Sequence, residues 1–112
     1  VGLFGFSFGG AMAALAADTT EVDLCGVALL APAAQVADDL DPRATLAAID
    51  APLAFVYGTR DTTAEWKPFY RAAETVGATT DAIEADHFFV GQSETVAAAV
   101  GGVLAEHCAP VA

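Results

Sequence analysis

A serine between two glycines is the first residue whose setting suggests chemistry. The segment Gly5-Phe6-Ser7-Phe8-Gly9 has the pattern G-x-S-x-G, in which the serine lies on a sharp turn between a strand and a helix. Such a turn exposes the hydroxyl to a base and a substrate, at the cost of strained dihedral angles on the serine. Glycines suit the outer positions because they carry no Cβ atom that would crowd neighbouring backbone. The pattern predicts a nucleophile at Ser7.

The residue after the serine would serve the same chemistry. Phe8 directly precedes the helix predicted from Gly9, and the helix N-terminus directs the Phe8 N–H towards an oxyanion that develops beside Ser7. Two other interpretations of this segment exist. Ser7 would be an ordinary helix N-cap, although a cap needs no glycine on both sides. A dinucleotide loop is disfavoured because Gly2, Gly5 and Gly9 do not give the spacing G-x-G-x-x-G.

A carboxylate and a histidine follow in the order that nucleophilic catalysis by a serine can use. Asp61 comes just after an apolar run that reads as a strand, and His87 lies in the loop after the next predicted strand. A histidine can remove the serine proton and pass it to the leaving group, and an aspartate can fix the histidine tautomer. The alternative for Asp61 is a solvated turn.

Other acidic and basic side chains fit these roles less well. Asp86 is adjacent to His87 and is badly placed to accept from its ring, and Asp50 and Asp81 begin strands at the opposite edge of a parallel sheet. His107 falls in the last turn of a helix, where a cation suits the helix dipole. Three aromatic side chains have two interpretations, as the lining of an acyl pocket or as part of the core: Trp66, Phe88 and Phe89.

The elements that must position these residues alternate between strand and helix. Apolar runs predict strands at 1–6, 24–31, 53–57 and 79–85, the last an edge strand and the first two buried. Helical patterns cover 9–17, 44–49, 64–76 and 93–107, with Ser93 as N-cap of the last. This alternation predicts an α/β fold, a parallel sheet with helices on both faces, within one domain over residues 1–112.

Taken together, the serine turn, the acid after the next-but-one strand and the histidine before the last helix resemble the α/β hydrolases, in the small dienelactone-hydrolase-like group. The resemblance covers residues 1–107 and implies the C-terminal half of that fold, about four strands and four helices. It implies that Ser7 is the nucleophile, His87 the general base and acid, and Asp61 the group that orients the imidazole. The implied activity is cofactor-free cleavage of small-molecule carboxylic esters, or related acyl bonds, through an acyl-enzyme. Dienelactone hydrolases themselves have a cysteine at the position of Ser7.

The same resemblance implies a partner for the first strand. In the complete fold the strand at 1–6 pairs with a strand of an N-terminal half, and a loop of that half gives the second oxyanion donor. The chain opens on Val1 rather than Met, so we expect a processed protein or a piece of a longer one. Three readings stay open: a working serine hydrolase, a truncated or split non-catalytic fragment, and a binding module on the same fold. The oligomeric state is open too.

Composition excludes several partners. The chain has 112 residues, 55% of them hydrophobic, and 15 acidic against 4 basic residues give a net charge of −11. Nucleic acid and anionic membrane surfaces would be repelled by this charge. The acidity suggests a halophilic surface kept soluble by carboxylates, with an acidic interaction surface as the alternative.

Two further expectations concern location and cysteine use. Residues 1–17 are nearly all apolar, but no basic region precedes them and glycines interrupt them, which disfavours a signal peptide or a membrane span. We therefore expect a cytoplasmic protein. Cys25 and Cys108 are too few for a disulfide framework or a metal cluster, and Cys25 reads as a small buried hydrophobe.

Overall fold

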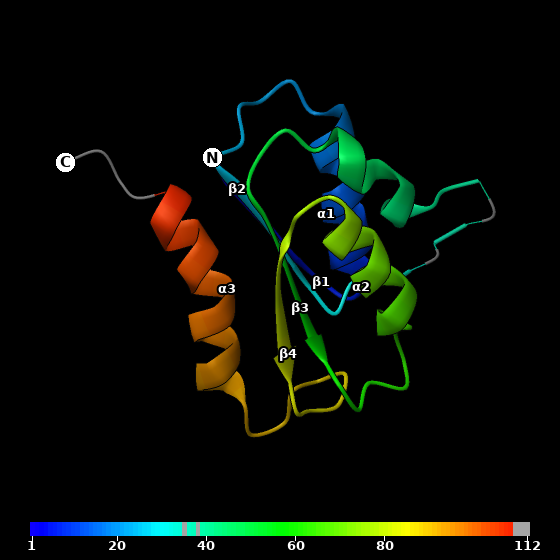
Figure 1. Cartoon of the computed structure of the whole chain (residues 1–112), viewed down its shortest axis with the longest axis vertical. Coiled ribbons are helices and arrows are strands. Elements are labelled where there is room, and N and C mark those ends of the chain that lie inside the picture. The colour runs from blue at the N-terminus through cyan, green and yellow to red at the C-terminus, as the bar shows by residue number, and fades with distance from the viewer. Residues whose placement is uncertain (35, 38, 109–112) are drawn as a thin grey trace.

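The computed structural model describes residues 1–34, 36–37 and 39–108, and these form a parallel sheet with helices on both faces (Figure 1). The sheet has four strands in the order β1-β2-β3-β4, all parallel. The strands are β1 (Gly2–Phe6), β2 (Gly26–Leu30), β3 (Leu53–Gly58) and β4 (Thr79–Ile83). The helices are α1 (Phe8–Thr19), the 3₁₀ helix η1 (Pro42–Ala48), α2 (Trp66–Thr75) and α3 (Ser93–His107). The predicted fold class is confirmed.

The two central strands are apolar throughout because both of their faces are covered. Every residue of β2 and β3 is buried. Side chains alternate across a strand, so one set meets α1, η1 and α2 and the other set meets α3. Parallel sheets covered in this way have continuous apolar strands rather than alternating ones. This explains why the two runs could be recognised from sequence.

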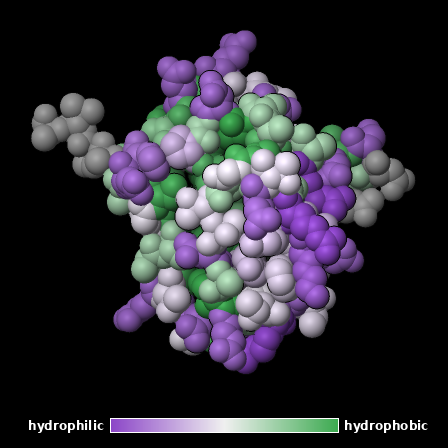
Figure 2. Space-filling view, viewed as in Figure 1, coloured by the Kyte–Doolittle hydropathy of each residue, from purple (hydrophilic) through white to green (hydrophobic). Residues whose placement is uncertain are grey.

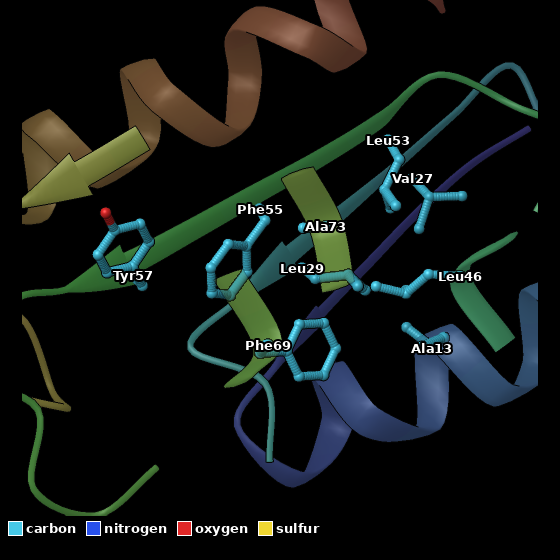
Figure 3. Close-up of a cluster of buried hydrophobic side chains, with 10 residues drawn as sticks. Ala13, Val27, Leu29, Leu46, Leu53, Phe55, Tyr57, Phe69 and Ala73 are labelled. Atoms are coloured by element: carbon cyan, nitrogen blue, oxygen red, sulfur yellow. The ribbon is translucent and has the colours of Figure 1, made fainter. Parts of the chain in front are cut away.

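The larger core lies between the sheet and the helices α1, η1 and α2 (Figure 3). Leu29 and Phe55 of the central strands meet Leu46 of η1 and Phe69 of α2 there. The rings of Phe55 and Phe69 stack with their centroids 5.3 Å apart. On the other face, side chains of α3 such as Val103 close smaller clusters over Ala28, Ala54 and Val56.

The first strand differs from its prediction. β1 is an edge of the sheet, and only Gly5 of its five residues is buried. Phe4 and Phe6 are 47% and 37% exposed. The expectation that this apolar run is buried is therefore wrong for the described residues, because burial depends on a neighbouring strand that these residues do not supply. β4 forms the opposite edge, as expected.

Local differences at helix ends have simple causes. The short helix predicted at 44–49 is a 3₁₀ helix that starts at Pro42, with Asp41 as its N-cap accepting a hydrogen bond from the Arg43 N–H at 2.9 Å. Ser93 is the first residue of α3 rather than its cap. Gln92 occupies the cap position, and no side chain bonds the helix end there.

The cysteines are paired, which corrects the expectation for Cys25. A disulfide joins Cys25, just before β2, to Cys108, just after α3, with the Cα atoms 5.3 Å apart. Cys25 is half-buried rather than a buried hydrophobe. A Cβ atom on Gly2 would lie 3.2 Å from the Cys108 sulfur. The glycine thus leaves room for the bridge, a tertiary relation that the spacing of two cysteines does not reveal.

Surface character varies around the molecule. In the view of Figure 2, hydrophilic residues form a band over the side where Figure 1 shows α2. Over the described ranges, no helix is long and apolar enough to cross a membrane.

Candidate active site

Ser7 lies in a tight turn between β1 and α1, as predicted. Its backbone has φ 56° and ψ −119°, a combination that is costly for a residue with a side chain. Two hydrogen bonds tie the turn to the end of β2. The Ser7 N–H donates to the Leu30 carbonyl, and the Ala33 N–H donates to the Ser7 carbonyl, both at 2.9 Å. The surrounding backbone therefore holds Ser7 in its strained conformation.

Of the two glycines predicted to prevent crowding in the turn, Gly5 and Gly9, only Gly5 does so. A Cβ atom on Gly5 would collide with the Gly9 carbonyl and lie 2.8 Å from the Gly10 Cα. Gly9 itself has open space where its Cβ would be, so the expectation of crowding there is wrong. Gly10 is the second constrained position, because its Cβ would lie 2.9 Å from the Cβ of Pro32. Helix α1 can approach the loop after β2 only with a glycine there.

Asp61 and His87 come from the loops after β3 and β4, at the carboxyl edge of the sheet. A Cβ atom on Gly58 would lie 2.5 Å from the Ala85 carbonyl oxygen and 2.7 Å from that of Asp86. The Arg60 N–H also donates to the Ala85 carbonyl at 3.0 Å. The glycine at the end of β3 thus lets the two loops pack together, a requirement that sequence reasoning missed.

The three predicted side chains meet in one hydrogen-bonded chain. Ser7 Oγ lies 2.8 Å from His87 Nε2, and His87 Nδ1 lies 2.7 Å from Asp61 Oδ2. An ionised carboxylate has no proton to donate, so Nδ1 carries the ring proton and Nε2 accepts from the Ser7 hydroxyl. His87 and Asp61 are 4% and 8% exposed. His87 Nε2 therefore faces the Ser7 hydroxyl, and His87 Nδ1 faces the Asp61 carboxylate.

Asp61 is itself fixed by the start of the next segment. Its Oδ1 accepts hydrogen bonds from the N–H groups of Thr63 and Ala64, both at 2.8 Å. With one oxygen held by backbone, the other faces the imidazole. These two backbone donors carry no signal in their side chains, so the sequence could not indicate them.

A backbone donor is available beside Ser7. Phe8 is the first residue of α1, and the first N–H groups of a helix have no acceptor inside it. The Phe8 N–H is thus placed at the helix start next to Ser7, where the sequence predicted an oxyanion donor.

A small pocket of about 280 Å³ opens onto Ser7 and His87. Three alanines, Ala33, Ala34 and Ala64, and the charged side chains of Arg43 and Glu65 line it. None of the aromatic side chains considered for an acyl pocket is in its lining. Phe88 and Phe89 border an apolar groove of about 460 Å³ beside β1, and Trp66 borders a separate hollow at α2.

Arg43 is oriented before any ligand arrives. Its Nε and Nη2 lie 3.1 Å from Oδ1 and Oδ2 of Asp41. The hydrogen bond from Arg43 holds the pKa of Asp41 below its usual value, and the same bond raises the pKa of Arg43. The pair is partly exposed, so we expect it to fix geometry more than stability.

Most of the remaining candidates lie where the sequence suggested, but Asp81 lies in the middle of β4 rather than at its start. Asp86 closes the His87 loop by accepting from the Phe88 N–H at 3.1 Å, and does not contact the ring nitrogens. Asp50 precedes β3 and Asp81 lies within β4, away from the carboxyl-edge loops. His107 ends α3 next to Glu106. In the part of the chain that the structure describes, no His, Cys, Asp and Glu cluster could hold a metal ion.

Comparison with known proteins gives structural matches alone. No protein-family model matches the chain, and no curated protein matches its sequence. An esterase from Pyrococcus furiosus matches with a TM-score of 0.78 at 17% identity, over 95% of this chain and 53% of that one. Est1E from Butyrivibrio proteoclasticus matches with a TM-score of 0.78 at 16% identity, over 96% and 60%. A protein assigned as a dienelactone hydrolase from Klebsiella pneumoniae matches with a TM-score of 0.70 at 20% identity, over 97% and 52%.

These matches bear on the fold. At such low identity they carry no residue roles, but they extend over nearly all of this chain, while the chain spans about half the length of these structures. The chain therefore has the α/β hydrolase fold of these esterases and hydrolases over the half that it spans.

Proposed function

We propose that this chain carries the catalytic residues of a serine hydrolase that cleaves carboxylic esters or related acyl bonds. The observation that supports the proposal best is the relay from Ser7 through His87 to Asp61, with distances of 2.8 and 2.7 Å. A backbone-strained serine in hydrogen-bond contact with a buried, oriented imidazole has no evident structural purpose. Strain of this kind is typical of functional sites.

The proposed reaction has two acyl-transfer steps. Ser7 Oγ attacks the ester carbonyl carbon while His87 Nε2 takes the hydroxyl proton. The tetrahedral adduct collapses to an ester of Ser7, and the imidazolium gives its proton to the departing alcohol. Water then repeats the sequence on the acyl-enzyme and releases the acid. The Phe8 N–H would stabilise the oxyanion in both steps.

No cofactor takes part in this scheme. The base, the orienting carboxylate and one oxyanion donor all belong to the chain. The proposed substrate is a small molecule whose acyl or alcohol group is short enough for a pocket of about 280 Å³.

Hydrolysis of p-nitrophenyl acetate by the natural protein, with whatever segments accompany residues 1–112, tests this proposal. Ser93 is the only other serine in the chain, so Ser93→Ala is a matched control. We expect Ser7→Ala to reduce kcat to background and Ser93→Ala to leave it unchanged. Equal turnover by wild type and Ser7→Ala would rule the proposal out.

A second candidate is a truncated or split fragment without activity of its own. The observation that favours it is the open apolar edge β1, together with a chain that spans about half of the matched structures. We propose that the partner of this edge is an N-terminal half of the same fold, which would also carry the second oxyanion donor. Losing one such donor typically slows turnover by about 10²–10³-fold. A binding module on the same fold would bind esters without turnover.

The cellular setting remains a proposal as well. The acidic composition supports a halophilic protein, and the expected cytoplasmic location stays a prediction. The disulfide argues against that location, because disulfides are rare where thiols are kept reduced. Alkylation of free thiols in intact cells, followed by mass spectrometry of the Cys25 and Cys108 peptides, tests the location. Alkylated cysteines would support the cytoplasm, and an intact disulfide would support an oxidising compartment.

A further inference from the structure

The imidazole of His87 is held by aromatic rings as well as by hydrogen bonds. The Phe6 ring stacks on it with centroids 5.3 Å apart and planes 29° from parallel. Phe88 meets it edge-on, at 5.1 Å and 81°. Phe6 is on β1 and directly precedes Ser7, so one turn of backbone carries both the nucleophile and this ring.

The two hydrogen bonds orient the imidazole, and the Phe6 ring restricts how far it can rock. Asp61 holds Nδ1 and Ser7 holds Nε2. Rotation about the Cα–Cβ or Cβ–Cγ bond of His87 moves these nitrogens and lengthens the hydrogen bonds. The Phe6 side chain lies against one face of the ring and opposes such rotation.

The stacked ring also bears on the charge of His87. In the proposed reaction the imidazole becomes a cation when it takes the Ser7 proton. A cation within about 6 Å of an aromatic face is attracted by the electron-rich face of the ring. Phe6 lies within that range of the ring that becomes charged, so its effect grows as the transition state is approached.

We propose that Phe6 is a positioning residue for catalysis, which restricts rotation of the His87 ring and favours its imidazolium form. The inference rests on the proposed hydrolase function. If Phe6 has this role, the residue between Gly5 and Ser7 affects the catalytic rate.

Phe4 offers a matched control. It lies two residues before Phe6, hence on the same face of β1, and it borders the same apolar groove. It is 47% exposed, against 37% for Phe6. The aromatic contacts of His87 are with Phe6 and Phe88 and do not include Phe4. Phe4→Leu therefore removes similar apolar surface without touching the imidazole.

The test compares Phe6→Leu, Phe6→Tyr and Phe4→Leu in the natural protein. We expect Phe6→Leu to lower kcat for p-nitrophenyl acetate by about 3- to 10-fold with KM unchanged. Phe6→Tyr keeps a ring and should restore most of the rate, and Phe4→Leu should match wild type. In NMR spectra, stacking should shift the ring protons of His87 upfield, and this shift should be lost in Phe6→Leu alone.

The outcomes separate this inference from the proposed function. If wild type hydrolyses the ester through Ser7 but Phe6→Leu keeps the full kcat, or Phe4→Leu loses as much, the positioning role is wrong and the hydrolase function stands. If wild type shows no Ser7-dependent turnover, the proposed function fails. If Phe6→Leu does not fold, the kcat of Phe6→Tyr and the chemical shifts of the His87 ring protons in wild type still test the inference. Ring protons of His87 without an upfield shift would overturn it.

Discussion

At the scale of single residues, the site depends on backbone as much as on side chains. Ser7 is held at φ 56° by hydrogen bonds to the end of β2. Asp61 is held by two backbone N–H groups. Gly58 lets the Asp61 and His87 loops approach one another. The geometry of the hydrogen-bonded chain of Ser7, His87 and Asp61 thus comes from neighbouring backbone.

Asp61→Asn tests the orienting role of the carboxylate. The asparagine Oδ1 can still accept from Thr63 and Ala64, so we expect the fold to survive. Its NH₂ would then face His87 Nδ1 and favour the tautomer with the proton on Nε2, which cannot accept from Ser7. We expect kcat for p-nitrophenyl acetate to fall by about 10⁴-fold, as in serine proteases.

The matched control is Asp86→Asn, which alters the neighbouring loop residue without touching the ring. It should keep kcat within a few-fold of wild type. Wild-type turnover in Asp61→Asn, or a collapse in Asp86→Asn alone, would mean that the acid has been assigned to the wrong residue.

Sequence reasoning predicted the three side chains that the structure brings together because each has a distinctive type at a predicted strand end. It missed Gly58 and Gly10 and placed the crowding at Gly9, because these constraints come from segments distant in sequence. It gave no signal for the N–H groups of Thr63 and Ala64, since every residue except proline has one.

At the scale of elements, the two edges of the sheet differ in character. β4 carries polar side chains such as Asp81, which discourage pairing with other strands. β1 carries no charge and exposes Phe4 and Phe6. Its backbone and its apolar face are both available to a further strand.

We predict that the 112-residue chain expressed alone self-associates through β1. An uncharged, apolar edge strand pairs readily with another copy. Size-exclusion chromatography should show dimers or larger species, and Phe4→Lys should shift them toward monomer. Val22→Lys, at an exposed apolar position outside the strands, should not. A stable, active wild-type monomer would show that β1 needs no partner.

Element positions could be predicted from local patterns, whereas the environment of each element could not. The runs that became β2 and β3 are apolar because both faces are covered, and this is visible in the sequence. The similar run at β1 was assigned to the interior, but its burial depends on a strand that is not in the described residues.

At the scale of the whole molecule, charge and a covalent link both act on stability. The net charge of −11 opposes compaction through repulsion between carboxylates. The disulfide joins residues 83 positions apart and therefore closes most of the chain into one loop. The net charge follows from composition and could be predicted from sequence. The disulfide depends on the tertiary fold and could not.

Reduction of the disulfide should lower the free energy of unfolding. Closing a loop of this length restricts the unfolded chain and typically stabilises a protein by about 2–4 kcal/mol. Urea unfolding with and without reductant measures the loss. The variant with Cys25→Ser and Cys108→Ser should match the reduced protein and respond no further to reductant. Indistinguishable midpoints for oxidised and reduced wild type would contradict this.

Salt should raise the melting temperature if the acidic surface is halophilic. The Debye length falls from about 30 Å at 0.01 M salt to about 3 Å at 1 M, so added salt screens the repulsion among carboxylates. A thermal scan from 0.05 to 2 M KCl should show a rising melting temperature. A flat or falling curve would favour the alternative, an acidic surface that binds a partner.

The central claim is that Ser7 is an activated nucleophile, and covalent trapping tests it most directly. The natural protein is treated with a fluorophosphonate probe, digested and mapped by mass spectrometry. Residues 1–112 contain two serines, Ser7 and Ser93, and the mapped peptide distinguishes Ser7 from Ser93 and from any serine outside these residues. We expect one adduct per chain, on Ser7, absent from Ser7→Ala and much slower to form in His87→Ala. No adduct on Ser7, or labelling that persists in Ser7→Ala, would contradict it.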